Sequence, residues 1–135
     1  MSAKVTAKTW GEDTPEFDNA KNEASKFLDR NFDGISFDEM PEEWDWQDVK
    51  GYDFTSSVKD QGSCGSCYLI ASNAMLETRI RIWFGENKEL SAQNRLDCNY
   101  LNEGCHGGWG YFDSLYLEQH GAISANCGPE YDGSL

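Results

Sequence analysis

Two cysteines three positions apart, in a glycine- and serine-rich turn that opens an apolar stretch, constrain this chain more than any other feature. The segment reads KDQGSCGSCYLIAS and spans residues 59–72. Gly62 to Ser66 are typical of a tight turn, and the residues from there to Gly85 have apolar side chains at helical spacing. The sequence therefore predicts a helix of about 17 residues that begins at Cys67.

Three kinds of site contain such a cysteine pair: a metal clip, a redox pair and a nucleophile on a helix end. Zinc needs four ligands, of which Cys64 and Cys67 supply one close pair. The second pair is weak, because Cys98 and Cys105 are seven apart and His106 directly follows Cys105. A thioredoxin-like pair follows a buried strand, and the residues before this turn have no such strand pattern. We expect no metal site.

A nucleophile accounts for more of the residues in the turn. A cysteine at the first helical position faces unpaired backbone N–H groups and the positive end of the helix dipole, which favour the thiolate. The N–H group of Cys67 and the side-chain amide of Gln61 would form an oxyanion hole. Cys64 would then be free for a structural disulfide. This hypothesis is the strongest of the three, and zinc and a redox pair remain as weaker alternatives.

Composition limits the class of partner. Acidic residues outnumber basic ones 24 to 11, and the net charge of -13 argues against nucleic acids and anionic membranes. No stretch reaches the roughly 18 apolar residues of a membrane span, and the N-terminus has no signal-peptide pattern. Five cysteines nevertheless suggest an oxidising compartment. A processed chain or a fragment would resolve that conflict.

Residues 1–40 are polar and contain no cysteine. The stretch TPEFDNAKNEASKFLDR predicts one amphipathic helix, with Thr14 as N-cap and Pro15 at the first helical position. The residues after it begin like a calcium loop, with Asp29, Asn31, Asp33 and Gly34. Met40 stands where that loop needs a bidentate glutamate, so we favour a surface turn.

The rest of the chain divides into a turn-rich part and a helical part. Residues 41–66 carry sparse aromatic anchors and predict an extended segment packed across a core. Residues 67–135 predict two helices after the first, a short one capped by Ser91 and one that ends before Gly121.

The segment QGSCGSCYLIAS resembles the active-site segment of the papain family of cysteine peptidases. Three further segments lie in the expected order around it: PEEWDWQDVKGYDFTSSVKDQ, LSAQNRLDC and GCHGGWGYFDSLYLEQHG. The resemblance covers residues 41–135 and implies the left, mainly α lobe of an α+β papain-like fold, with a central helix at the nucleophile and a stabilising disulfide. Residues 1–40 would be an activation-segment remnant or a docking arm.

The resemblance also implies a role for each matching residue. Cys67 matches the nucleophile and Gln61 the oxyanion-hole amide, while Cys64 would bridge to Cys105. The residues that would shape the turn or contact a peptide substrate are Gly65, Ser66, Gly107, Gly108, Trp109 and Tyr111. No cofactor is required.

Within the family, Tyr68 and the segments WDWQDVKGYDFTSSV, MLETRIRI and ANCGPEYDG are similar to cathepsin C, a lysosomal dipeptidyl-peptidase. This similarity implies that Trp109 and Tyr111 match the positions that form a second subsite and hold a chloride ion. It also implies residence in a lysosome, a vacuole or the secretory pathway; a cytoplasmic chain or a fragment is the alternative. Cys98 and Cys127 match cysteines whose partners lie further downstream.

The base that completes such a site is not evident. In this family a histidine and an asparagine come from a second lobe, roughly 130 to 150 residues after the cysteine. His106, beside the expected disulfide, and His120, at a helix C-terminus, are poor substitutes. One hypothesis is a peptidase half completed by a second chain that holds the His/Asn lobe. The other is an inactive half-lobe that serves as a structural or binding component, its apolar face covered by a partner.

Overall fold

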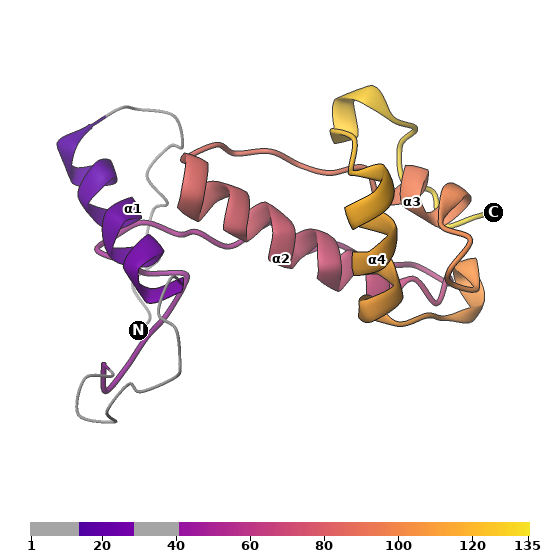
Figure 1. The fold of residues 1–135 in the computed structure, drawn as a ribbon, viewed down its shortest axis with the longest axis horizontal. Coiled ribbons are helices and arrows are strands. Elements are labelled where there is room, and N and C mark those ends of the chain that lie inside the picture. The colour runs from indigo at the N-terminus through magenta and orange to yellow at the C-terminus, as the bar shows by residue number, and fades with distance from the viewer. Residues whose placement is uncertain (1–13, 29–40) are drawn as a thin grey trace. The chain divides into compact units, whose positions relative to one another are not determined.

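The computed structural model describes residues 14–28 and 41–135, and these ranges are mainly helical (Figure 1). The helices are α1 (Pro15–Leu28), α2 (Cys67–Phe84), α3 (Ala92–Cys98) and α4 (Gly110–His120), with short 3-10 turns η2 (Gly104–His106) and η3 (Ala125–Cys127). Pairing of extended backbone within the described ranges is limited to isolated bridges, Val49 with Tyr52 and Leu90 with Ser124. The mainly α lobe is therefore confirmed. The calcium-like pattern lies outside the described residues.

The described residues form two compact units, and the first contains residues up to 55 together with residues 79–87. Its helix α1 begins as predicted, because the hydroxyl oxygen of Thr14 accepts the N–H of Phe17 at 3.2 Å and Pro15 follows the cap. The core of this unit is made of Phe17, Ala20, Ala24, Val49, Tyr52, Phe54 and Ile82, with Trp44 and Trp46 packed against it. The aromatic anchors thus do pack across a core.

The second unit contains residues 56–78 and 88–135. Helix α3 has the predicted cap, since the hydroxyl oxygen of Ser91 accepts the N–H of Asn94 at 3.2 Å. Helix α4 ends at Gly121, whose positive φ of 73° suits a residue without a side chain. The apolar cluster of this unit consists of Cys64, Tyr68, Leu69 and Leu96, with Ile70, Ala92, Cys105 and Tyr131 at its edge. None of the helices in the described ranges is long and apolar enough to cross a bilayer.

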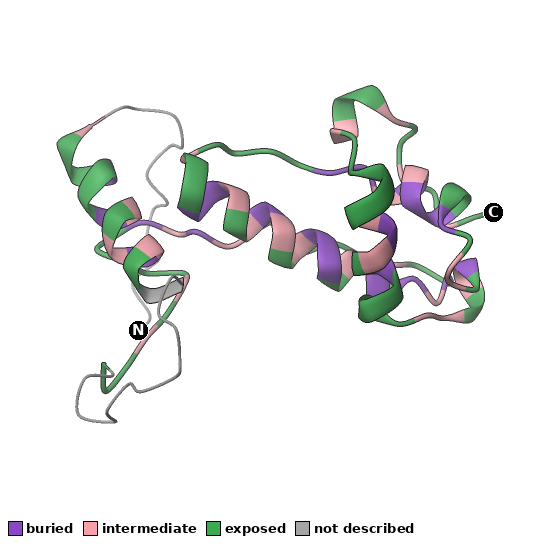
Figure 2. Ribbon diagram, in the orientation of Figure 1, coloured by how far each residue is buried: buried purple, intermediate pink, exposed green. Residues whose placement is uncertain are grey.

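Helix α2 has a buried face that is more polar than the sequence predicts. In its first three turns Asn73 and Glu77 are buried, whereas Met75 is 44% exposed. Figure 2 shows buried, intermediate and exposed bands along α2. The amide of Asn73 donates to the carbonyl of Leu90 at 3.2 Å, and Glu77 accepts the N–H of Leu90 at 2.8 Å. The structure therefore adds two polar residues to the buried face of the predicted helix, because the loop beside it needs partners for its backbone.

A buried ion pair joins α3 to α4. Arg95 and Asp113 lie 3.1 Å apart, and their side chains are 1% and 0% exposed. Asn99 donates to the Asp113 carboxylate at 3.1 Å, while Arg95 donates to the carbonyl of Leu69 in α2 at 3.1 Å and to Asn73. Burial raises the pKa of Asp113 and lowers that of Arg95, because desolvation of each charge outweighs the attraction between them.

Candidate active site

Cys67 is the first residue of α2, and its thiol is exposed. The carbonyl of Ser66 accepts the N–H groups of Leu69 and Ile70, both at 3.1 Å, so the hydrogen bonds of the helix begin at the residue before the cysteine. The N-terminus of an 18-residue helix carries a partial positive charge, which favours negative charge on a group at this position. The predicted start of the helix is therefore confirmed, and it presents the sulfur to solvent.

The turn before Cys67 is held by its own backbone and by one carboxylate. Asp60 accepts the N–H of Gly62 at 2.9 Å, and Gly62 has a positive φ of 61° that favours glycine. The carbonyl of Gln61 accepts the N–H of Cys64 at 3.4 Å, and the Cys64 carbonyl accepts that of Ser66 at 2.8 Å. These bonds fold Gln61 and Ser66 into one compact turn.

A second segment lies against this turn. Cys64 and Cys105 form a disulfide with an S–S distance of 2.10 Å, as the resemblance implies. The N–H of Gly65 donates to the carbonyl of Cys105 at 2.8 Å, and a Cβ atom at position 65 would lie 2.6 Å from that oxygen. Gly65 therefore permits close contact between the nucleophile turn and the segment that starts at Cys105. The disulfide also uses two of the sulfurs on which the zinc alternative depends, and the described residues contain no group of three side chains that could hold a metal.

Gln61 and Cys67 line the same open groove in the second unit, with a volume of about 680 Å³. The rest of its lining comes from residues 56–60 and from Ile70, Ala71 and Ala74. The structure thus brings the predicted nucleophile and the predicted oxyanion-hole residue to one surface. Neither histidine of the sequence is part of the lining.

Gly107, Gly108 and Trp109 line a separate hollow of about 320 Å³. Asn102, which the sequence analysis did not single out, supports this edge: its side-chain oxygen accepts the N–H of Trp109 at 2.8 Å. A Cβ atom at position 108 would lie 2.4 Å from the same oxygen, so any larger residue here would displace the Asn102 side chain. No local sequence pattern indicates Asn102, because its partners lie across a loop.

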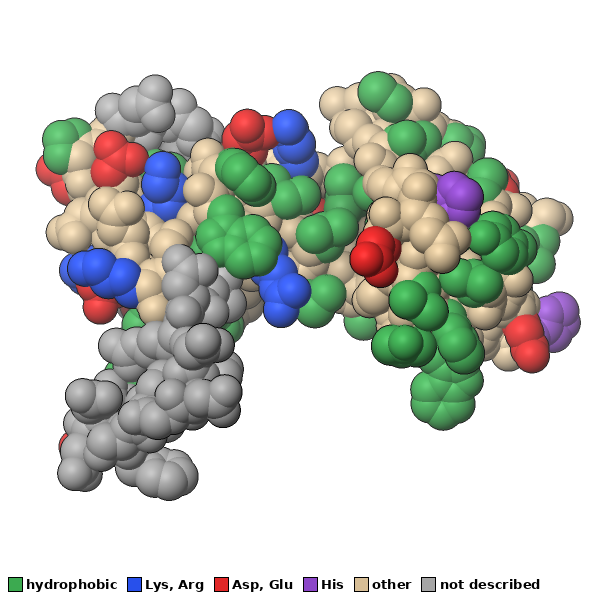
Figure 3. All heavy atoms as spheres, viewed as in Figure 1, with side chains coloured by type: hydrophobic (Ala, Val, Ile, Leu, Met, Phe, Trp, Pro, Cys, Tyr) green, Lys and Arg blue, Asp and Glu red, His purple; other side chains and the backbone are tan. Residues whose placement is uncertain are grey.

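Exposed aromatic residues continue from this hollow onto the first turn of α4. Trp109 is 72% exposed, Tyr111 70% and Phe112 40%. Figure 3 shows hydrophobic side chains gathered on the surface around α4. Tyr111 has its ring centroid 5.7 Å from that of Phe112 and is otherwise open, so the described residues do not enclose an anion there.

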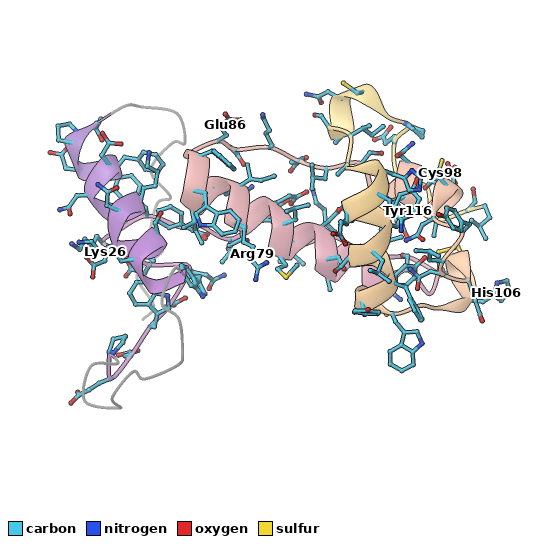
Figure 4. All side chains as sticks on the ribbon, in the orientation of Figure 1. Lys26, Arg79, Glu86, Cys98, His106 and Tyr116 are labelled. Atoms are coloured by element: carbon cyan, nitrogen blue, oxygen red, sulfur yellow. A yellow bond between two sulfur atoms is a disulfide. The ribbon has the colours of Figure 1, made fainter. Side chains whose placement is uncertain are left out.

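The two histidines lie in other surroundings. His106 ends η2 and projects from the ribbon (Figure 4), where it lines the hollow beside Gly107. His120 is the last residue of α4. Its ring centroid lies 4.5 Å from that of Tyr116 and 5.9 Å from that of Tyr100. His120 is therefore part of an aromatic cluster.

One further residue contacts the nucleophile turn from a distant part of the sequence. The hydroxyl of Tyr131 lies 2.6 Å from the hydroxyl oxygen of Ser66 and 2.9 Å from the carbonyl oxygen of Gln61. Ser66 is completely buried, so its side chain faces this tyrosine rather than the groove. Sequence reasoning missed Tyr131, since nothing in its neighbourhood indicates a contact 65 residues away.

Comparison with known proteins gives one consistent family. The sequence profile of the family described as papain family cysteine protease matches residues 40–134. The chain is 37% identical over 97 residues to cathepsin L 2 of Paramecium tetraurelia, covering 70% of this chain and 31% of that protein. It is 36% identical over 97 residues to zingipain-1 of Zingiber officinale, covering 72% of this chain and 42% of that protein.

A solved structure of a cysteine protease supports the same family. The crystal structure of the Carica candamarcensis cysteine protease CMS1MS2 in complex with E-64 matches with a TM-score of 0.62 and 34% identity, over 70% of this chain and 42% of that one. The chain thus spans less than half the length of these relatives. Since the family profile covers most of the sequence, the chain belongs to the papain family of cysteine proteases.

Proposed function

We propose that this chain carries the nucleophile half of a papain-like peptidase site. The observation that carries the proposal is the position of Cys67, exposed at the N-terminus of α2 and sharing one groove with Gln61. In the proposed reaction the Cys67 thiolate adds to a peptide carbonyl carbon, and the carbonyl π electrons move to oxygen. The Gln61 amide and the backbone N–H of Cys67 stabilise that oxyanion. Collapse expels the amine and leaves an acyl-enzyme thioester, which water hydrolyses.

The general acid of this proposal comes from a second lobe. A protonated histidine must donate to the leaving amine, and an asparagine must orient it. Because neither His106 nor His120 lines the groove with Cys67, we place both groups in a lobe that covers this groove, on a second chain or on a longer form of this one. The completely exposed Val58 and the half-buried Ile70 supply an apolar lining for such a lobe.

The substrate in this proposal is an extended peptide that runs past Gly107 and Gly108 toward Trp109. Cathepsin C-like dipeptidyl specificity is a finer proposal that rests on Tyr68 and on the further segments similar to that enzyme. The similar proteins include cathepsin F of Drosophila melanogaster and ananain of Ananas comosus as well as cathepsin L, so they favour the family rather than this branch. The same resemblance supports a proposed lysosomal, vacuolar or secretory location. For residues 1–40 we propose a separate role as an activation-segment remnant or a docking arm.

A second candidate is a catalytically inactive half-lobe that acts as a structural or binding component. The observation that favours it is the groove lining, which holds Cys67 without a histidine among the described residues. In that case Cys67 is an ordinary surface thiol, and the Cys64–Cys105 disulfide only preserves the shape of the lobe.

Alkylation at about pH 5 separates the two candidates, because an ordinary thiol with a pKa near 8.5 is almost wholly protonated there. Iodoacetamide is added to the protein as isolated, with any partner chains attached, and each modified cysteine is quantified by peptide mass spectrometry. Cys98 and Cys127, which are free and exposed in the same chain, are internal controls. We expect Cys67 to react at least about tenfold faster than either. Equal rates at all three would reject the peptidase proposal in favour of the inactive lobe.

A further inference from the structure

We infer that Tyr131 is a positioning residue for the oxyanion hole, an inference that rests on the function proposed above. Its hydroxyl lies 2.9 Å from the carbonyl oxygen of Gln61 and 2.6 Å from the hydroxyl oxygen of Ser66. Gln61 begins the nucleophile turn and Ser66 directly precedes Cys67. One hydroxyl group therefore connects the two ends of the turn that carries both the proposed donor and the nucleophile.

The direction of these hydrogen bonds follows from which atoms can donate. The Gln61 carbonyl can only accept, so the single proton of the Tyr131 hydroxyl goes to it. The same oxygen then accepts from the Ser66 hydroxyl, which is completely buried. This chain of bonds satisfies a buried serine and fixes the peptide carbonyl at position 61 in one step.

The tyrosine bond is the shorter of the two that hold the Gln61 carbonyl. The other partner is the N–H of Cys64 at 3.4 Å, close to the limit of a hydrogen bond. Gln61 itself is only half-buried, at the edge of the groove. Loss of the tyrosine hydroxyl would leave the backbone from which the Gln61 side chain extends held mainly by that long bond.

Packing holds the tyrosine against the turn independently of its hydroxyl. Its side chain packs against the cluster that contains Cys64, Tyr68 and Leu69. The backbone at Gly133 also lies against the turn, since a Cβ atom there would be 3.4 Å from the Gln61 carbonyl oxygen and 3.6 Å from the Cβ of Cys64. The ring thus stays in place when the hydroxyl is removed, and the effect of the hydroxyl can be measured alone.

Tyr131 acts through Gln61 and touches no reacting atom. It should therefore affect only those reactions of Cys67 in which an oxyanion develops. Addition of the Cys67 thiolate to an aldehyde forms an S–C bond and moves the carbonyl π electrons to oxygen, so that step uses the hole. Alkylation by iodoacetamide forms an S–C bond and releases iodide, and no oxyanion develops. A positioning role for Tyr131 therefore influences the first reaction and leaves the second unchanged.

The test compares Tyr131→Phe with the wild-type protein, isolated with any partner chains attached. Two quantities are measured: the affinity for a peptide aldehyde and the rate of Cys67 alkylation by iodoacetamide at pH 5. We expect about tenfold weaker aldehyde binding, less than the hundredfold or greater effect of deleting an oxyanion donor itself. The alkylation rate should stay within about twofold. Tyr100→Phe is the matched control, because that hydroxyl contacts Gln119 and His120 instead.

Several results would overturn the inference. Unchanged aldehyde affinity in Tyr131→Phe would show that the hydroxyl positions nothing, and an equal fall in alkylation would indicate a structural role. Ser66→Ala keeps the bond from Tyr131 to Gln61, so it should weaken aldehyde binding less than Tyr131→Phe does. The reverse order would reject a route through the Gln61 carbonyl. If wild-type Cys67 neither binds the aldehyde nor alkylates at pH 5, the proposed function itself fails.

Discussion

Gly65 lies where two loops come closer than any side chain allows. The missing Cβ atom would be 2.6 Å from the Cys105 carbonyl oxygen and 3.3 Å from the backbone nitrogen of Gly107. Both neighbours are backbone atoms, and the disulfide between Cys64 and Cys105 prevents the loops from separating. The identity of residue 65 therefore sets the spacing between the nucleophile turn and the glycines of the proposed cleft.

We predict that Gly65→Ala lowers the free energy of unfolding by about 1–3 kcal/mol, as overpacking does elsewhere. The measurement is urea unfolding followed by circular dichroism. Gly110→Ala is the matched control, because the added Cβ would lie an ordinary 3.6 Å from the Ser72 hydroxyl oxygen and alanine favours the helix. The control should be neutral or stabilised by up to about 1 kcal/mol. Equal stability of the two variants would contradict this account of the close contact.

For single residues, the sequence predicts a role only where the pattern that indicates it lies within a few neighbouring positions. Cys67 and Gln61 are found because a glycine-rich turn before a helix is visible within a few residues. Tyr131 and Asn102 are not found, because each acts through a bond to the backbone of a different loop. No sequence pattern around a tyrosine or asparagine in a loop indicates a hydrogen-bond partner in another loop.

The helices of the second unit are connected by charge as well as by apolar contact. Arg95 of α3 reaches Asp113 of α4 and the Leu69 carbonyl of α2, and it is almost fully buried. Removing one charge of such a pair leaves the other unpaired in the interior, whereas removing both is often neutral. We therefore expect this ion pair to matter more for how the helices pack than for net stability.

We predict that Arg95→Leu destabilises the chain by about 3–5 kcal/mol, and that Arg95→Leu with Asp113→Ala is less destabilised than Arg95→Leu alone. The loss in the single variant should also depend on pH. Burial already raises the pKa of Asp113, and without Arg95 that pKa rises further. Stability from this carboxyl is complete below its ordinary pKa and is lost as the pH rises through the raised value.

Urea unfolding at pH 5 and pH 8 measures this dependence. The deficit of Arg95→Leu should be larger at pH 8, where Asp113 is forced to ionise without its partner, and the double variant should show no such difference. A deficit that is the same at both pH values would mean that solvent reaches Asp113 in the variant. A double variant weaker than the single one would mean that packing volume outweighs charge at this position.

Element boundaries were predictable, and the buried face of α2 was not. Thr14, Ser91 and Gly121 are caps or stops that act within one helical turn, and all three are where the sequence places them. What covers α2 depends on segments remote in sequence. Glu77 is buried because it accepts a loop N–H, a reason that helical periodicity does not contain.

For the chain as a whole, the Cys64–Cys105 disulfide is the one covalent link between distant segments in the described part. It closes a loop with a sequence separation of 41. Loss of this constraint on the unfolded chain gives an expected destabilisation of about 4 kcal/mol. We predict that value, as an upper estimate, for the paired variant Cys64→Ala with Cys105→Ala, measured by urea unfolding.

Cys98→Ala provides the control for this measurement, because Cys98 is free and exposed. It should change the free energy of unfolding by less than about 0.5 kcal/mol. If the paired variant is as stable as the control, the nucleophile turn does not depend on its covalent link, and the hydrogen bond from Gly65 to Cys105 is sufficient.

The bond between Ser66 and Tyr131 has a consequence for synthesis of the protein. The two residues are 65 positions apart, and a ribosome adding 5–20 residues per second needs about 3–13 seconds to make that stretch. Throughout that interval the nascent nucleophile turn lacks the hydroxyl that joins its two ends. Cys67 thus emerges before the geometry that we propose to make it useful, so the newborn chain carries a thiol and acquires an organised site only when residue 131 follows.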